Sequence, residues 1–334
     1  VLLWWCLILL LFETEMRVIS ATVLDRESLS NNDAVDNTDA VRLRLRLHLV
    51  RHGETESNRQ NLVLGQTDSP LTPLGVRQAH AASLAFGLES SSFWRRYTSD
   101  LPRAQRTANI LLGGEITEGD ASTQTRIMVT NDERLRERAK GVREQRDKSL
   151  TYDEAMELHL AEVNHNNHNS DNNNSNGSMP LLESETEVWD RFQNWMEEVL
   201  QDMLRLSNHQ SSMQHDSITI SNDGTMLEQE QSSDTAGMAQ SRRDGIHHVL
   251  VVSHSGTLRT VIGKLVGDQL PSHISTLPVG KDGAKKGSLH VPNTSRTIID
   301  IFPNTFDGNT NPPKWRATLV DLTNTSHFDD ISSN

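Results

Sequence analysis

Apolar and polar residues alternate along several short stretches of the chain, and each such stretch predicts a β-strand. Between Leu43 and Val50, leucines at every second position alternate with arginine and histidine, the pattern of a strand with one buried face. His248–Val252 is instead a continuous apolar run, typical of a strand covered on both faces. Three further strands are predicted at Trp94–Ser99, Thr297–Ile301 and Ala317–Leu322.

Helical patterns stand between these predicted strands. One helix is expected to follow Pro73, and a second begins at Pro102, a residue favoured in the first turn, and runs through Ile110. Glu183–Leu206 carries apolar residues near helical spacing, which predicts an amphipathic helix. A further helix passes through Leu258, Ile262 and Leu265. Strands that alternate with helices predict a layered α/β fold.

Polar segments interrupt this pattern at three places. Residues 13–40 are polar and acidic without periodicity, which predicts a disordered lead-in. The Asn- and His-rich tract Asn164–Ser178 and the Ser-, Gln- and Asp-rich tract Ser207–Gly245 read as inserted loops. We therefore predict an N-terminal segment, 1–40, and a single domain, 41–328, with disordered inserts near 160–180 and 207–245.

Charge and cysteine content exclude several classes of protein. The 334 residues include 32 Lys and Arg against 45 Asp and Glu, a formal net charge of −13. Such a balance argues against general binding to nucleic acid or anionic lipid, although it leaves room for a small cationic pocket. The single cysteine, Cys6, excludes an intramolecular disulfide framework and a thiolate zinc site.

The first twelve residues, Val1–Phe12, form an apolar run that is too short to span a bilayer as an ordinary helix. The run resembles the apolar part of a signal peptide or a truncated anchor, but no basic flank or small-residue cleavage site stands nearby. Alternatively, synthesis starts at Met16 and the run is never made. We favour a cytoplasmic location without membrane contact; secretion or membrane anchoring is the alternative if residues 1–12 are retained.

Two similar clusters follow two of the predicted strands. Arg51-His52-Gly53 ends the first strand, and His254, followed by Ser255 and a glycine, ends another. Ligands of open α/β sheets bind outside the carboxyl ends of the strands, and an arginine beside a histidine offers an anion a cationic fork next to an imidazole. Either histidine alone is more often structural. The two together favour a shared site.

These residues resemble the signature of the histidine phosphatase (phosphoglycerate mutase-like) superfamily. Further matching motifs follow in the family's order: Gly65–Thr72, Thr98–Ala104, Arg134–Arg138, Glu183-Ser184 and Ser253-His254. The resemblance implies a three-layer sandwich with a central, mostly parallel β-sheet flanked by helices. Within the superfamily, Arg134–Arg138, the long insert before the second histidine strand, and Val291–Thr294 most resemble the TIGAR type, a group associated with fructose-2,6-bisphosphate and other sugar phosphates.

The resemblance also implies roles for individual residues. His52 would be the nucleophile that becomes a phosphohistidine, and Glu137 would be the general acid for the leaving oxygen. Arg51 and Arg103 would hold the phosphoryl oxygens, and His254 would donate a further hydrogen bond. Because two arginines and a histidine then neutralise the phosphoryl group, no metal ion or other cofactor is expected. Glu137 stands in a charge-dense stretch, where a solvated face is the other interpretation.

Three more positions complete the predicted substrate site: Asn58, Gly65 and Ser255. Asn58 would add a neutral donor, and Ser255 replaces the family's usual glycine while leaving the backbone donors in place. Leu64 departs from the glutamine that many members carry before Gly65. These departures concern specificity more than the phosphoryl centre.

The resemblance thus implies a metal-independent phosphomonoesterase acting on a small phosphorylated metabolite, with fructose-2,6-bisphosphate or a related sugar phosphate as the leading expectation. One alternative is a phosphoglycerate mutase, although the insert typical of such mutases is not evident after Glu137. The other alternative is a non-catalytic relative that only binds a phosphorylated ligand.

Overall fold

The computed structural model describes residues 43–87, 92–114, 128–169, 179–215, 245–272, 274–275, 287–303 and 315–328. All of these residues fall within one compact unit of the chain. The predicted segment 1–40, with its apolar run, lies outside the described residues. None of the helices that are described is both long enough and apolar enough to cross a membrane.

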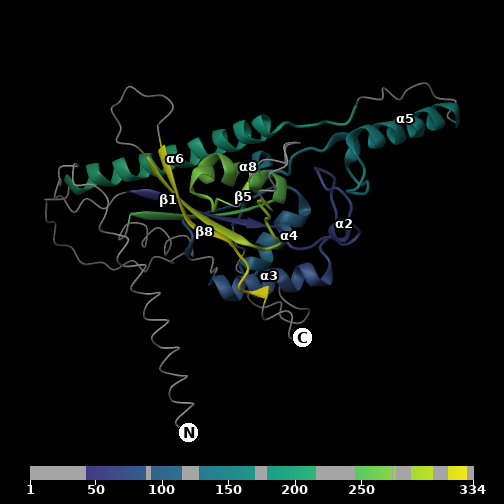
Figure 1. Cartoon of the computed structure of the whole chain (residues 1–334). Coiled ribbons are helices and arrows are strands. Elements are labelled where there is room, and N and C mark those ends of the chain that lie inside the picture. Colours follow the sequence, from purple (N-terminus) through teal and green to yellow (C-terminus); the bar gives the residue numbers. More distant parts are fainter. Residues whose placement is uncertain are drawn as a thin grey trace, which may run out of the picture. The chain divides into compact units, whose positions relative to one another are not determined.

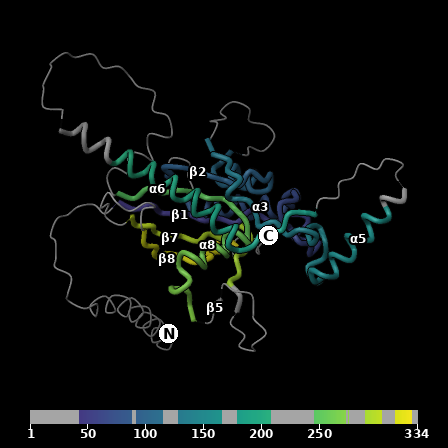
Figure 2. Tube along the Cα trace, turned by 90° about the horizontal axis from the view of Figure 1, so that it is seen from above, coloured from purple at the N-terminus to yellow at the C-terminus, as the bar shows by residue number. Residues whose placement is uncertain are grey.

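A six-stranded sheet with the order β3-β2-β4-β1-β7-β8 forms the centre of this unit. Its strands are β1 (Arg44–Arg51), β2 (Arg95–Thr98), β3 (Thr130–Asn131), β4 (Ile246–Ser253), β7 (Arg296–Pro303) and β8 (Trp315–Asn324). The pairs β1–β4, β4–β2 and β2–β3 are parallel, whereas β7 runs antiparallel to both β1 and β8. Figure 2 shows β1, β7 and β8 side by side. The prediction of a mostly parallel sheet is confirmed.

The α-helices are α2 (Glu56–Arg59), α3 (Pro73–Phe86), α4 (Pro102–Leu111), α5 (Tyr152–Asn169), α6 (Glu185–His215) and α8 (Ser255–Val266). Short 3-10 turns, η2 (Glu133–Leu135), η3 (Gly141–Arg143) and η4 (Gly267–Gln269), and a two-stranded pairing of β5 (Ile274–Ser275) with β6 (Gly287–Ser288) complete the described elements. The strands and helices predicted from periodicity are all present. Of the described elements, α5 and the shortest ones were not predicted.

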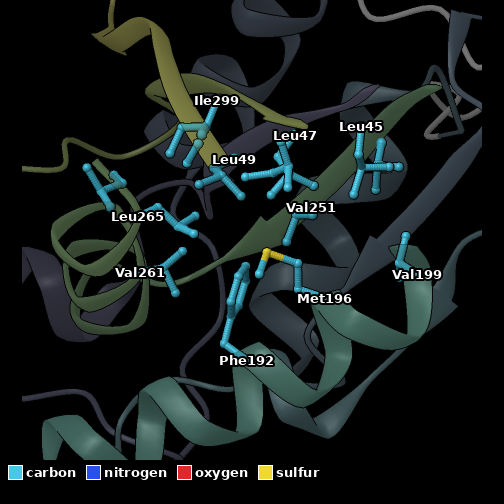
Figure 3. Packing of buried hydrophobic residues seen from close by; sticks show 14 of the residues in the cluster. Leu45, Leu47, Leu49, Phe192, Met196, Val199, Val251, Val261, Leu265 and Ile299 are labelled. Carbon is cyan, nitrogen blue, oxygen red and sulfur yellow. The ribbon is translucent and has the colours of Figure 1, made fainter. Parts of the chain in front are cut away.

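Helices α6 and α8 cover one face of the sheet (Figure 1). The leucines at 45, 47 and 49 of β1 are buried against apolar residues of these two helices, among them Phe192 and Met196 of α6 and Val261 of α8 (Figure 3). Since side chains alternate along a strand, this layer explains why every second residue of β1 is leucine.

The opposite face of the sheet carries α3 and α4. Val50 of β1 and Val252 of β4 are buried there with Ala104 and Ala108 of α4 and Ala82 of α3. The small residues let these helices lie close to the sheet. With helices on both faces, the predicted three-layer α/β sandwich is confirmed.

Two helices extend into segments for which the sequence predicted inserted loops. The chain is helical as far as Asn169 in α5 and as far as His215 in α6, and the remainder of both segments lies outside the described residues. The prediction of inserted loops relied on the lack of residues that could be buried, and few residues near the end of α5 are buried. Its anchor is instead polar, because Arg146 donates to both oxygens of the Glu162 carboxylate at 3.1 and 2.7 Å.

Candidate active site

The parallel register of β1 and β4 brings the two motif histidines together. Arg51 pairs with Ser253 at the carboxyl ends of these strands, and the His52 backbone N–H donates to the Ser253 carbonyl at 3.0 Å. The next residues are His52 and His254, whose ring centroids lie 5.1 Å apart with an interplanar angle of 56°. The structure therefore brings together the two histidines for which the sequence predicts one shared site.

The His52 ring is held in one tautomer. Its Nδ1 lies 2.7 Å from the Gly53 carbonyl oxygen, and a carbonyl can only accept, so Nδ1 carries the proton and Nε2 the lone pair. Burial lowers the pKa of His52 well below its usual range, and the charges of Arg103 and Arg51 lower it further. The ring is thus a neutral imidazole with Nε2 available as a nucleophile.

Arg51 and Arg103 approach the histidines from β1 and from the first turn of α4. Arg51 Nη1 donates to the Val291 carbonyl at 2.8 Å. Arg103 is buried, with Nη2 donating to the Gly65 carbonyl at 2.7 Å and Nη1 to the Thr67 carbonyl at 2.9 Å. These backbone acceptors fix both guanidinium groups and carry no net charge. Nη1 of Arg103 also lies 3.6 Å from a carboxylate oxygen of Asp68, with which it forms an ion pair. Burial lowers the pKa of Arg51 to about 10, so it remains charged at neutral pH.

Several buried nitrogen atoms of this cluster have no hydrogen-bond partner within the part of the chain that the structure describes. They are Nε of Arg51, Nε of Arg103, and both ring nitrogens of His254. Burial, followed by the charge of Arg103, lowers the pKa of His254 well below its usual range, so this ring is neutral and keeps one N–H to donate. Buried donors without acceptors are costly, and here they gather around two cations. Such an arrangement suits a bound anion that accepts several hydrogen bonds.

The Glu137 carboxylate lies at the start of α8, next to the second histidine. Its oxygens accept from the backbone N–H groups of Gly256 at 2.9 Å, Thr257 at 3.1 Å and Arg138 at 2.7 Å. The position is favourable for a negative group, since the first N–H groups of a helix lack intrahelical acceptors. Glu137 is buried, which excludes the solvated-face interpretation. Its role as an acid stays a prediction.

The three remaining predicted residues line the same region in different ways. Asn58 accepts from the Thr55 backbone N–H at 3.3 Å and so takes part in the capping box of α2. Gly65 contributes its carbonyl to Arg103 rather than a donor to a ligand. Ser255 is the first residue of α8, directly after His254. Whether any of them binds substrate stays a prediction.

Comparison with known proteins relates part of this chain to a protein family. The sequence model of the histidine phosphatase superfamily (branch 1) matches residues 47–205. Residues 47–205 belong to the histidine phosphatase superfamily. The match includes His52, Arg103 and Glu137 and ends before β4, so that the structure, rather than the match, adds His254 to the site.

Several known proteins are similar to this chain. A probable phosphoglycerate mutase GpmB of Proteus mirabilis is 36% identical over 151 residues, which are 45% of this chain and 60% of that protein. The chain thus spans less than two thirds of the length of that relative. A solved phosphoglycerate mutase of Bacillus anthracis is 19% identical, with 87% of this chain and 98% of that chain covered and a TM-score of 0.46. A solved putative alpha-ribazole-5'-P phosphatase of Escherichia coli is 22% identical, with coverage of 84% and 97% and a TM-score of 0.43.

Two further residues hold the site together. The Thr107 hydroxyl accepts from the Gly53 N–H at 3.0 Å and donates to the Arg103 carbonyl at 2.7 Å. The Asn293 amide donates to the His52 carbonyl at 2.9 Å. Asn293 stands in the Val291–Thr294 motif and Thr107 lies shortly after the Thr98–Ala104 motif, but the sequence alone assigned neither residue a role. Their contacts are with backbone atoms, which leave no pattern in a single sequence.

The surroundings of the site add two lysines and a cavity. The ammonium groups of Lys140, near Glu137, and Lys148, near Arg51, make no hydrogen bond or ion pair with the described residues. A cavity of about 460 Å³ lies beside the same loops, lined by Gln66, Thr67, Ala139, Gly141, Val142, Glu144, Arg146, His159, Pro180 and Leu181.

Among the described residues, no three His, Cys, Asp or Glu side chains group in a way that could hold a metal ion.

Proposed function

We propose that this chain is a phosphomonoesterase that works through a phosphohistidine at His52. The observation that carries the proposal is the convergence of two neutral imidazoles, 5.1 Å apart, with two charged guanidinium groups whose buried Nε atoms lack acceptors. A phosphoryl group supplies the oxygens that these donors need, because its transfer concentrates negative charge on the equatorial oxygens.

In the first step, Nε2 of His52 attacks phosphorus. The N–P bond forms as the bond from phosphorus to the leaving oxygen breaks, and Glu137, protonated for this step, gives that oxygen its proton. Arg51 and Arg103 hold the equatorial oxygens, and the neutral His254 donates its N–H to the same group. In the second step the oxygen of a water molecule bonds to phosphorus as the N–P bond breaks, and Glu137 takes a proton from that water. Inorganic phosphate is released, and His52 returns to its neutral form.

Metal independence is part of the proposal. Arg103 is a buried cation and Arg51 a half-buried one, and backbone carbonyls fix both, so they offer the charge that a divalent ion supplies in other phosphoryl-transfer sites. Turnover should therefore persist in excess chelator. A loss of activity that only an added divalent cation restores would contradict this part of the mechanism.

The substrate that we propose carries a second anionic group. Lys140 is half-buried and Lys148 is exposed, and neither ammonium group has an acceptor within the described residues. Fructose-2,6-bisphosphate or a related sugar phosphate fits this requirement and agrees with the TIGAR-like motifs of the sequence. Lys148→Met should raise KM for such a bisphosphate about tenfold, the size of one charge-assisted hydrogen bond, and leave KM for a monophosphate unchanged.

A phosphoglycerate mutase is the second candidate, because curated relatives are named probable phosphoglycerate mutases. A mutase would use the same histidine but retain the substrate and return the phosphoryl group to it. Purified protein assayed with fructose-2,6-bisphosphate and 3-phosphoglycerate separates the two. Release of inorganic phosphate supports the phosphatase, and formation of 2-phosphoglycerate supports the mutase.

Trapping of the phosphoenzyme tests the central step. The full chain incubated with a labelled phosphodonor and quenched should carry acid-labile phosphate, absent in His52→Ala. His254→Ala should lose most turnover, since the donor it removes acts on developing charge. His247→Ala is the matched control, because His247 is also a buried histidine of β4 but packs against Trp94 instead of the site. Full activity in His52→Ala overturns the mechanism. Phosphate binding without trapped label favours a non-catalytic relative.

A further inference from the structure

The loop before β7 makes direct contact with the two residues at the end of β1. The Thr294 backbone N–H donates to the Arg51 carbonyl at 3.0 Å, and the Arg51 guanidinium donates to the Val291 carbonyl at 2.8 Å. The Asn293 amide donates to the His52 carbonyl at 2.9 Å. Residues 291–295, which we call the clamp loop, therefore fix both the backbone and the guanidinium group of the phosphate-binding arginine.

The clamp loop depends on a residue in an unfavourable conformation. Thr294 has φ of +54°, in the left-handed region that a β-branched side chain rarely adopts, and it is fully buried. Such a conformation persists only where neighbouring groups hold it. A contact that holds Thr294 therefore has consequences for every hydrogen bond that the loop makes to Arg51 and His52.

His327, in the segment that follows β8, provides that contact. Its Nε2 lies 2.7 Å from the Thr294 hydroxyl oxygen, and that hydroxyl donates its single proton to the Asn293 carbonyl at 2.8 Å. His327 Nε2 therefore carries a proton and donates it to Thr294. The imidazole is completely buried, with the rings of Phe86 and Phe328 at centroid distances of 5.0 and 4.4 Å.

We infer that His327 is a positioning residue for the phosphoryl site, acting through Thr294 on Arg51. The inference rests on the proposed function, because Arg51 has a ligand to bind only if the site takes a phosphoryl group. His327 itself makes none of the contacts described for His52, His254 or the arginines. Its hydrogen bond keeps the clamp loop in the one conformation in which Val291, Asn293 and Thr294 make their hydrogen bonds to residues 51 and 52.

Binding of inorganic phosphate by calorimetry, together with steady-state kinetics, tests the inference on the full chain. His327→Leu keeps an apolar group between the phenyl rings but removes the donor, and we expect the phosphate Kd and KM to rise about tenfold, the effect of one buried hydrogen bond. His327→Gln places an amide N–H near the position of Nε2, so it should restore most of the affinity. A residue that only supports folding would not show this rescue.

Two controls separate positioning from general loss of stability. His247→Leu also removes a buried histidine side chain from the sheet region, against Trp94, and it should lower Tm without changing the phosphate Kd. Thr294→Ala removes the acceptor of the proposed hydrogen bond. Combined with His327→Leu, it should weaken phosphate binding little beyond either single change, because both act through one contact.

The outcomes distinguish this inference from the proposed function. If the wild-type chain binds no phosphate, the proposed function fails and the inference fails with it. If the wild type binds phosphate and His327→Leu binds it equally well, only the role of His327 is overturned. Equal weakening in His327→Leu and His327→Gln, or in the His247→Leu control, also overturns the role of the hydrogen bond.

Discussion

Nδ1 of His52 lies 2.7 Å from the carbonyl oxygen of Gly53, the residue that follows it. This contact assigns the ring proton to Nδ1, and burial with the charges of Arg103 and Arg51 lowers the pKa of the ring well below 6.5. A lowered pKa means that the neutral form of His52 persists to lower pH than in a solvent-exposed histidine.

Phosphoenzyme formation should therefore retain an unprotonated nucleophile as the pH falls from 8 through 6.5, because the acid limb due to His52 lies below 6.5. Single-turnover rates with the phosphodonor at saturation measure this limb. An NMR titration of the labelled imidazoles assigns it to His52. A midpoint at or above pH 6.5 for this ring would contradict the electrostatic description.

Replacement of Arg103 by lysine should lower kcat/KM far more than the unchanged charge of the side chain suggests. The two terminal nitrogens of Arg103 reach two different carbonyls, those of Gly65 and Thr67, and one ammonium group cannot keep both contacts and also face a phosphoryl oxygen. We expect kcat/KM to fall about 100- to 1,000-fold, as for loss of a preorganised donor. Arg106→Lys, at an exposed position of the same helix, should change kcat/KM less than twofold.

Variants of three glutamates in the charge-dense stretch should separate their roles. Glu137→Gln should lower kcat about 100-fold with little change in KM, because it removes the proposed proton donor. Glu144 instead accepts from the backbone N–H groups of Gln66, Thr67 and Lys140, so Glu144→Gln should lower Tm and raise KM by loosening the loop that carries Gly65.

Glu133→Gln is the control in this series, because its side chain is 76% exposed. Its kcat, KM and Tm should all equal those of the wild type. A Glu137→Gln variant with normal kcat would remove this residue from the proposed chemistry, and it would make Glu144 the next candidate.

Gly53 should not tolerate alanine. A Cβ atom at this position would lie 2.5 Å from the carbonyl oxygen of Gly75, a backbone atom that cannot rotate away. Gly53→Ala should lower the free energy of unfolding by about 1–3 kcal/mol and displace the neighbouring His52. Gly267→Ala, where nothing lies within 4 Å of the added atom, is the control, and thermal unfolding with phosphate affinity measures both.

Acid sensitivity of the fold should come in part from His48. Burial, followed by the effect of His248, lowers its pKa from 6.5 to about 3. Between these values the unfolded chain binds the proton and the folded chain does not, so stability falls as pH falls below 6.5. His48→Phe should flatten this slope by up to about 1.4 kcal/mol per pH unit, as measured by denaturant unfolding from pH 7 to 4. An unchanged slope would refute the assignment.

Much of the fold could be predicted from the sequence because burial leaves a periodic trace. The alternating leucines of β1 and the apolar run of β4 follow from their places at the centre of a sheet covered on both faces. Helix α5 left little such trace. Its leucines at 158 and 160 are largely exposed, and the helix is tied to the domain by a salt bridge between side chains that are polar in any conformation.

The site was predictable where its residues stand in contiguous motifs at strand ends. His52, Arg51 and His254 follow from position, and Arg103 follows from its motif at the first turn of α4. Contacts through backbone atoms could not be predicted in this way. Asn293 and Thr107 act on carbonyl and amide groups that every residue possesses, and His327 meets Thr294 only because β8 returns the chain beside the clamp loop.

The pairing of Arg51 with Ser253 sets the positions of His52 and His254 relative to each other. A slip of β4 by one residue would turn His254 toward the opposite layer, and a slip of two residues would restore its direction but move it by about 7 Å along the strand. His52 and His254 are therefore aligned by main-chain hydrogen bonds, which a side-chain substitution does not remove directly. Changes in substrate preference are free to accumulate in the surrounding loops, while the distance between the two imidazoles stays set by the sheet.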